Sequence, residues 1–160
     1  MDRRKELPLR LGVGVILLNH TNKVFVGKRI DNPKKFWQMP QGGVEKNEEL
    51  FKAAKRELEE ETSIKSVELI KELDGWIEYN LPKNLLGKVW KGKYKGQRQK
   101  WFVMKFLGDD KEISVKTKHP EFFEWKWIEL DKITDVVVDF KLNVYKEVKE
   151  KVKRIISEEI

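Results

Sequence analysis

Three acidic residues, Glu57, Glu60 and Glu61, have the type and spacing that metal chemistry requires. In a helix, positions i, i+3 and i+4 project from one face, so the three carboxylates would converge. Like charges at this spacing repel each other, and hard cations such as Mg²⁺ or Mn²⁺ relieve the repulsion by accepting carboxylate oxygens. The same pattern is also typical of an acidic helix face exposed to solvent. The neighbouring sequence distinguishes the two interpretations.

Upstream residues occur at fixed distances from these glutamates. Five residues separate Gly42 from Glu48, and seven more lead to an Arg-Glu pair that begins at Arg56. The segment 42–64 resembles the Nudix box, whose pattern is glycine, five residues, glutamate, seven residues, arginine-glutamate, an aliphatic residue, any residue, two glutamates, any residue, glycine and an aliphatic residue. Every specified position matches except the last glycine, which is Ser63 here.

The resemblance implies a hydrolase of phosphoanhydride bonds that requires Mg²⁺ or Mn²⁺. Glu57, Glu60 and Glu61 would bind the metal, which neutralises phosphate charge and acidifies the attacking water. Glu57 or Glu60 would accept the proton of that water, and the sequence does not choose between them. The number of metal ions is also left open.

Other residues of the box are expected to shape the site. Gly42 and Gly43 let the main chain approach a ligand or metal closely, and Gly42 is counted among the candidate metal ligands. In the family, the arginine at the position of Arg56 pairs with the glutamate at the position of Glu48 and fixes the loop against the helix. Because Arg56 lies one residue before Glu57, its side chain is expected to point elsewhere on the helix.

Matching segments also occur outside the box, and a glutamine at Gln41 precedes the double glycine. Together they resemble the RNA pyrophosphohydrolase subgroup, close relatives of the diadenosine polyphosphate hydrolases. The glutamine before the double glycine marks this subgroup. The segments appear in the order of the family and comprise residue 10 and residues 13–19, 24–29, 36–43, 81–83, 94–102, 120–122, 125–127 and 137–145.

The resemblance to this subgroup implies roles for four further residues. Arg10 would contact a substrate phosphate, and Glu121 would supply another metal ligand. Arg29 and Phe140 would sandwich the first or second base of an RNA. The alternatives are that Phe140 is the first core residue of the last helix and that Arg10 and Glu121 are ordinary surface charges. The base preference stays open.

Basic residues are concentrated between Tyr79 and Gly108, where no Asp or Glu occurs. Eight Lys or Arg residues lie in this stretch with aromatic residues between them, and the whole chain carries a net charge of +7. Bases stack on aromatic rings while ammonium groups meet phosphates, so the stretch favours nucleic acid. The alternative is a solvated lysine-rich loop and strand. The residues expected to contact RNA are Lys91, Lys93 and Lys95.

A helix over residues 48–61 must position the glutamates of the box. Its apolar residues, at positions 50, 53, 54 and 58, form one stripe of helical period. Asn47 is expected as the N-cap, and Glu48 and Glu49 in the first turn complement the helix dipole. This helix is the element that the sequence predicts most directly.

Strands and a second helix complete the expected fold. Apolar runs at 11–18 and 23–29 predict a hairpin around the turn at 19–22. A second helix is predicted from about 140 to 156, and further strands are expected at 67–79, 100–106 and 123–128. The expected fold class is α/β, with the mixed β-sheet of the Nudix fold sandwiched between α-helices.

Length and composition limit the class of protein. A chain of 160 residues suits a single domain, expected to span residues 1–160. The absence of cysteine excludes disulfides and thiolate metal sites, and His20 and His119 are interpreted as turn residues. Without a signal peptide or a long apolar run, the protein is expected in the cytoplasm, with no membrane partner. A monomer is favoured, although the sequence leaves the oligomeric state open.

Three functions follow from these observations. The first is hydrolysis of the 5′-triphosphate of RNA to a 5′-monophosphate with release of diphosphate, which would promote RNA decay. The second is asymmetric hydrolysis of diadenosine tetraphosphate, which needs the same metal site and one adenine stack. The third is a non-catalytic RNA-binding module. It is disfavoured because the repulsion among Glu57, Glu60 and Glu61 would be unfavourable without a metal.

Overall fold

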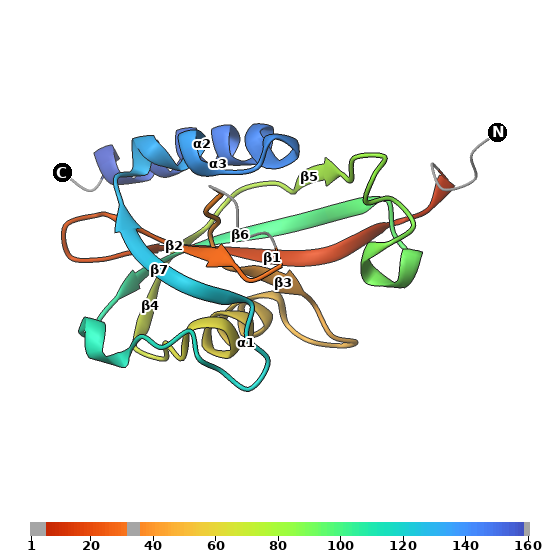
Figure 1. Ribbon diagram of the computed structural model, residues 1–160. Coiled ribbons are helices and arrows are strands. Elements are labelled where there is room, and N and C mark those ends of the chain that lie inside the picture. Colours follow the sequence, from red (N-terminus) through yellow and green to blue (C-terminus); the bar gives the residue numbers. More distant parts are fainter. Residues whose placement is uncertain (1–5, 32–35, 159–160) are drawn as a thin grey trace.

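The computed structural model describes residues 6–31 and 36–158. Its central feature is a mixed seven-stranded sheet with helices on both faces (Figure 1). This arrangement confirms the α/β fold expected from the sequence. Within the described ranges, no helix is long and apolar enough to cross a membrane.

One parallel pair of strands organises the sheet. β1 and β6 run parallel and pair from Leu9 with Gly96 to Leu18 with Lys105. The order across the sheet is β4-β6-β1-β2-β7, while β3 pairs with β1 and β5 pairs with β6. All pairs other than β1 with β6 are antiparallel. The strands are β1 (Leu9–Leu18), β2 (Val24–Arg29), β3 (Gln41–Gly43), β4 (Val67–Glu72), β5 (Ile77–Asn80), β6 (Gly96–Phe106) and β7 (Phe122–Ile128).

Helix α1 covers one face of the sheet, and α2 and α3 cover the other (Figure 1). Short 3-10 turns connect several of the elements. The helices are α1 (Leu50–Thr62), α2 (Ile133–Val136) and α3 (Leu142–Glu158), and the 3-10 turns are η2 (Val89–Gly92), η3 (Asp110–Glu112), η4 (Leu130–Lys132) and η5 (Asp139–Lys141).

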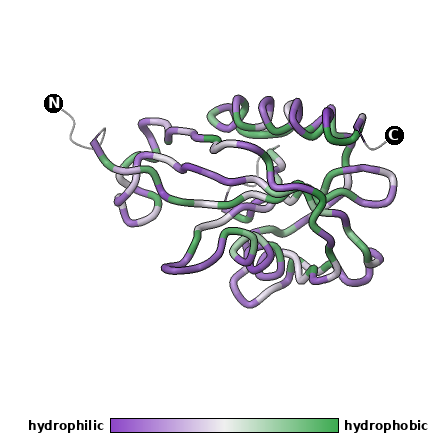
Figure 2. Tube along the Cα trace, turned by 180° about the vertical axis from the view of Figure 1, so that it is seen from behind, coloured by the Kyte–Doolittle hydropathy of each residue, from purple (hydrophilic) through white to green (hydrophobic). Residues whose placement is uncertain are grey.

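The core lies in two layers, one on each side of the sheet. Strand β1 contributes to both because its side chains alternate between the faces. Val13 and Val15 pack in the layer under α1, whereas Ile16 and Leu18 pack in the layer under α3. Hydrophobic and hydrophilic residues alternate around the turns of α3 in Figure 2, as expected for a helix with one buried face. The sheet is therefore a rigid platform, buried on both faces.

The predicted hairpin is present as β1 and β2, joined by a turn with Asn22 in the left-handed region at φ 61°. The single strand predicted over 67–79 is wrong, because a bend with Gly75 at φ 77° divides it into β4 and β5. Both strands pair with β6. Strand β6 begins at Gly96, earlier than predicted, because its first residues are polar and lack the apolar run that identifies a strand.

The helix of the box begins later than predicted, and the assignment of Asn47 as its N-cap is wrong. Glu49 is the N-cap residue, without a side-chain capping bond, and Asn47 adopts φ 64° in the preceding turn. The helix ends as the box pattern suggests, with Ser63 in the left-handed conformation at φ 67°. Its Oγ donates a hydrogen bond to the carbonyl oxygen of Ser114 at 3.0 Å. Serine therefore takes the place of the expected glycine without disturbing the cap.

The last helix is also divided. Phe140 lies in η5, and α3 starts only at Leu142, whereas the prediction placed both in one helix. Val144, Val148 and Val152, spaced by four residues, are buried as expected. Phe140 and Lys141, which precede α3, line the pocket of the candidate active site.

Candidate active site

A pocket of about 700 Å³ gathers most of the residues that the sequence singled out. Residues of β1, β2, β3, α1 and η5 contribute to its lining. Its lining includes the predicted site residues Arg10, Arg29, Gly42, Gly43, Glu57, Glu60, Glu61, Glu121 and Phe140. Residues up to 130 positions apart in the chain, such as Arg10 and Phe140, therefore share one cavity.

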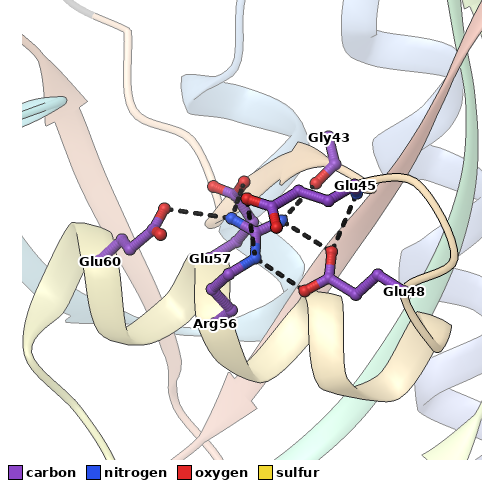
Figure 3. A network of polar contacts seen from close by, with 6 residues as sticks. All are labelled: Gly43, Glu45, Glu48, Arg56, Glu57 and Glu60. Atoms are coloured by element: carbon purple, nitrogen blue, oxygen red, sulfur yellow. Dashed lines mark hydrogen bonds and ion pairs between the residues drawn. The ribbon is translucent and has the colours of Figure 1, made fainter.

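Arg56 is the centre of a polar network beside this pocket (Figure 3). Its Nε and Nη2 donate to the two carboxylate oxygens of Glu48 at 2.8 and 3.0 Å, and Nη2 also donates to the carbonyl oxygen of Gly43 at 2.8 Å. The hydrogen bonds from Arg56 lower the pKa of Glu48. The expected pair of Arg56 and Glu48 is present, and it joins β3 and the loop after it to α1.

The expectation that Arg56 points away from Glu57 is wrong. Its Nη1 donates to Glu57 Oε1 at 2.9 Å and to Glu60 Oε2 at 3.2 Å. The arginine side chain is long enough to bring its guanidinium group back along the helix to both carboxylates (Figure 3). Arg56 therefore offsets part of the repulsion among the glutamates of α1.

Glu57 lies against the main chain of Gly42. A Cβ atom on Gly42 would overlap the carboxyl group of Glu57, so any other residue at this position would displace that side chain. Burial raises the pKa of Glu57, and the charge and hydrogen bond of Arg56 oppose that rise. The glycine therefore lets the Glu57 carboxyl group lie directly against β3.

Glu61 is the most buried of the three glutamates, with an exposed fraction of 5%. Its Oε2 has no hydrogen-bond partner among the described residues. Burial raises the pKa of Glu61 well above its ordinary value, and the charges of Glu57 and Glu121 raise it further. A buried carboxylate oxygen that lacks a partner is unfavourable, and a cation in the pocket would satisfy it.

Glu60 and Glu121 are more exposed, with exposed side-chain fractions of 58% and 48%. Although all four carboxylates line the pocket, no three acidic or histidine side chains in the described parts of the chain are grouped tightly enough to hold an ion. The fold brings the predicted metal ligands into one cavity but leaves Glu60 paired with Arg56 and Glu121 beside Arg29.

Arg10 of β1 and Arg29 of β2 line the same pocket as the carboxylates. Arg29 makes two hydrogen bonds with Asp31, at 2.7 and 2.6 Å, and lies 3.6 Å from Glu121. Phe140 contacts Tyr79 with 5.8 Å between ring centroids. Arg29 and Phe140 both line the pocket, and the expected sandwich of a base between them stays a prediction.

The three lysines predicted to bind RNA are not part of the pocket lining. Lys91 and Lys93 are exposed and Lys95 is half-buried, in and just after η2. Their neighbour Trp90 reaches the pocket instead. The structure therefore places these lysines outside the pocket lining, on the same segment as Trp90, which lines the pocket.

Sequence reasoning missed Lys141, which lines the pocket with an exposed fraction of 5%. Its Nζ donates to Gln38 Oε1 at 3.3 Å, and burial lowers its pKa to about 7. A signal was available, because Lys141 lies three and four residues before the buried Val144 and Tyr145 and so continues their helix face. A lysine is seldom buried, so its residue type by itself predicts exposure.

Fold and site together define a Nudix protein. Residues 8–149 match the family model of the NUDIX domain, and the chain therefore belongs to the Nudix family. It is 71% identical over 156 residues to an RNA pyrophosphohydrolase of Pelagibacter ubique (strain HTCC1062), with 98% of this chain and 99% of that protein covered.

A second relative and a solved structure extend the comparison. The chain is 49% identical over 144 residues to an RNA pyrophosphohydrolase of Dinoroseobacter shibae, with 89% of this chain and 90% of that protein covered. The fold is similar to that of the E. coli dihydroneopterin triphosphate pyrophosphohydrolase, with a TM-score of 0.69 and 20% identity. The match covers 88% of this chain and 96% of that one, and at this identity it shows the fold alone.

Proposed function

We propose that this Nudix hydrolase removes diphosphate from the 5′-triphosphate end of RNA and leaves a 5′-monophosphate. The observation that carries the proposal is one pocket lined by Glu57, Glu60 and Glu61 together with Arg10. An arginine can bind the phosphate chain while carboxylates bind a cation, as phosphoanhydride hydrolysis requires. The high identity to relatives named RNA pyrophosphohydrolase supports RNA as the substrate.

Glu57, Glu60 and Glu61, with Glu121 and the carbonyl of Gly42, would hold Mg²⁺ or Mn²⁺. Carboxylate and carbonyl oxygens are the ligands that these ions prefer. The buried, unpartnered Oε2 of Glu61 supports a cation at this place in the described structure. When bound, the metal supplies charge neutralisation of the phosphates and acidifies the attacking water.

The residues of the chain then divide the remaining tasks. Arg10 binds a phosphate of the substrate, and Glu57 or Glu60 accepts the proton of the water that attacks phosphorus. The phosphoanhydride bond breaks, and diphosphate leaves with the electron pair. Arg29 and Phe140 hold a base near the 5′ end. We place the enzyme in the cytoplasm as a monomer, where its product would enter RNA decay.

A second candidate is asymmetric hydrolysis of diadenosine tetraphosphate. It is favoured by the aromatic rings of Trp37 and Phe140 in the pocket lining, because an adenine can stack on an aromatic ring. The same carboxylates and arginines would serve this reaction.

The test is a direct comparison of the two substrates with purified protein and Mg²⁺. We expect 5′-triphosphorylated RNA to give diphosphate and monophosphorylated RNA, with a higher kcat/KM than diadenosine tetraphosphate. A higher kcat/KM for diadenosine tetraphosphate would instead identify the dinucleotide as the preferred substrate. Tight RNA binding without turnover of either substrate, with Mg²⁺ or Mn²⁺, would instead indicate a binding module.

A further inference from the structure

Arg10 lies close to both a tryptophan ring and a glycine main chain. Its Cζ is 5.3 Å from the centroid of the Trp90 ring. A Cβ atom on Gly43 would overlap the guanidinium group. Arg10, Gly43 and Trp90 come from β1, β3 and η2, and all three line the pocket.

In residues 6–31 and 36–158, Arg10 makes no hydrogen bond and no ion pair, in contrast to Arg29 and Arg56. A cation–π contact orders a guanidinium group without a hydrogen bond, so its N–H donors stay available. The contact with Trp90 therefore orders Arg10 without using the donors that a phosphate requires.

The backbone of η2 is unusual at the same place. Trp90 adopts φ 52° and ψ 37°, and Lys91 adopts φ 58° and ψ 24°. Two successive left-handed residues that carry a Cβ are unfavourable and tend to occur at functional sites. Tyr94 supports the conformation by an edge-on contact with the Trp90 ring at 6.2 Å. The chain thus adopts a strained turn that leaves the ring in the pocket.

We propose that Trp90 is a positioning residue that holds the guanidinium group of Arg10 ready for a substrate phosphate. The inference rests on the proposed function for the identity of the substrate, but not for the anion site itself. It explains why an aromatic residue is present in the pocket between lysines that stay outside.

Two substitutions of Trp90 distinguish an effect of the aromatic ring face from an effect of apolar packing alone. Trp90→Leu keeps an apolar side chain but removes the face, and we expect it to raise KM for triphosphorylated RNA about 3- to 30-fold, the range of a cation–π contact. The value of kcat should change less than about twofold, because the chemical groups are untouched. Trp90→Phe should restore most of the parent KM.

Trp76 provides a matched control. It stacks on Arg98 at 4.4 Å, but neither residue lines the pocket. Trp76→Leu should therefore keep the parent KM. In an Arg10→Ala background, adding Trp90→Leu should change KM less than about twofold, because the contact is already lost. An equal effect of Trp90→Leu with and without Arg10 would overturn the inference, as would equal KM values for Trp90→Leu and the parent.

A binding measurement keeps the inference separate from the proposed function. Inorganic tripolyphosphate is titrated calorimetrically into parent and Trp90→Leu with divalent metal chelated, so no turnover is required. We expect binding to the parent and about 3- to 30-fold weaker binding to the variant. If the parent cleaves neither substrate but this difference persists, only the proposed function fails. If parent and variant bind tripolyphosphate equally, or neither binds, the inference fails whatever the activity.

Discussion

Arg56 and Glu48 are joined by two parallel hydrogen bonds, at 2.8 and 3.0 Å, across a loop that precedes α1. Such a paired geometry between guanidinium and carboxylate groups is both strong and directional. Because Arg56 also holds the carbonyl of Gly43, it fixes the distance between β3 and α1. The glutamates of α1 and the double glycine of β3 therefore keep their relative positions through this one side chain.

Arg56→Ala should lower the free energy of unfolding by about 1–3 kcal/mol. The substitution removes hydrogen bonds to charged groups and leaves Glu48, Glu57 and Glu60 without a compensating charge. Urea denaturation measures the change. Lys52→Ala, an exposed position in the same helix, is the control and should stay within about 0.5 kcal/mol of the parent. A loss no larger than that of the control would show that the network does not stabilise the fold.

Glu57→Gln and Glu60→Gln should each reduce turnover of triphosphorylated RNA by about 10²-fold or more. Each change removes a candidate metal ligand and proton acceptor while preserving the shape of the side chain. Circular dichroism and thermal melting should show an intact fold. Glu59→Gln is the control, because Glu59 lies in the same helix, is exposed and pairs with Lys65 at its surface. Near-parent kcat in both test variants would refute their assignment.

Simultaneous replacement of Lys91, Lys93 and Lys95 by Ala should weaken the binding of long RNA more than the binding of diadenosine tetraphosphate. Each lost phosphate contact reduces the salt dependence of binding, and three contacts should lower the slope of log K against log salt by about 2. Affinity measured over a series of salt concentrations tests this expectation. The matched control replaces Lys111, Lys116 and Lys118, which are also exposed but lie in the segment before β7. If the two triple variants behave alike, the lysines near η2 have no special role in RNA binding.

Lys141 should make the stability of the metal-free protein depend on pH. Burial lowers its pKa from 10.5 to about 7, so between these values the unfolded chain binds a proton that the folded chain does not. The free energy of unfolding attributable to Lys141 therefore rises with pH across this window, and the full penalty is present below it.

Lys141→Met removes the titrating group and with it the free-energy cost of burying a charged lysine. Relative to the parent, the variant should gain most at about pH 6, by at most about 5 kcal/mol, and the gain should shrink toward about pH 10. Denaturation at several pH values measures this difference. Lys146→Met, exposed on α3, should follow the pH dependence of the parent. A constant difference between Lys141→Met and the parent at all pH values would contradict the prediction.

The sequence by itself determined the elements whose pattern is local. The apolar stripe of Ala53, Ala54 and Leu58 repeats every three or four residues and predicts α1, and the same helix period places Glu57, Glu60 and Glu61 along one side of it. The resemblance of this segment to the Nudix box implied the chemistry and the pair of Arg56 and Glu48. The polar start of β6 and the cap of α1 were less predictable, because a strand that begins with glycine, glutamine and arginine and an asparagine in a left-handed turn have weak local signals.

Only the tertiary structure decided which distant residues share the pocket. The parallel pairing of β1 with β6 lets η2, just before β6, place Trp90 over Arg10. Packing of α3 on the sheet buries Lys141 beside Gln38, although a lysine is ordinarily exposed. These contacts join segments about 80 to 100 residues apart, and periodicity reports only on neighbours within one element. Which side chains meet depends on how the layers pack, and that is set by burial of the whole core.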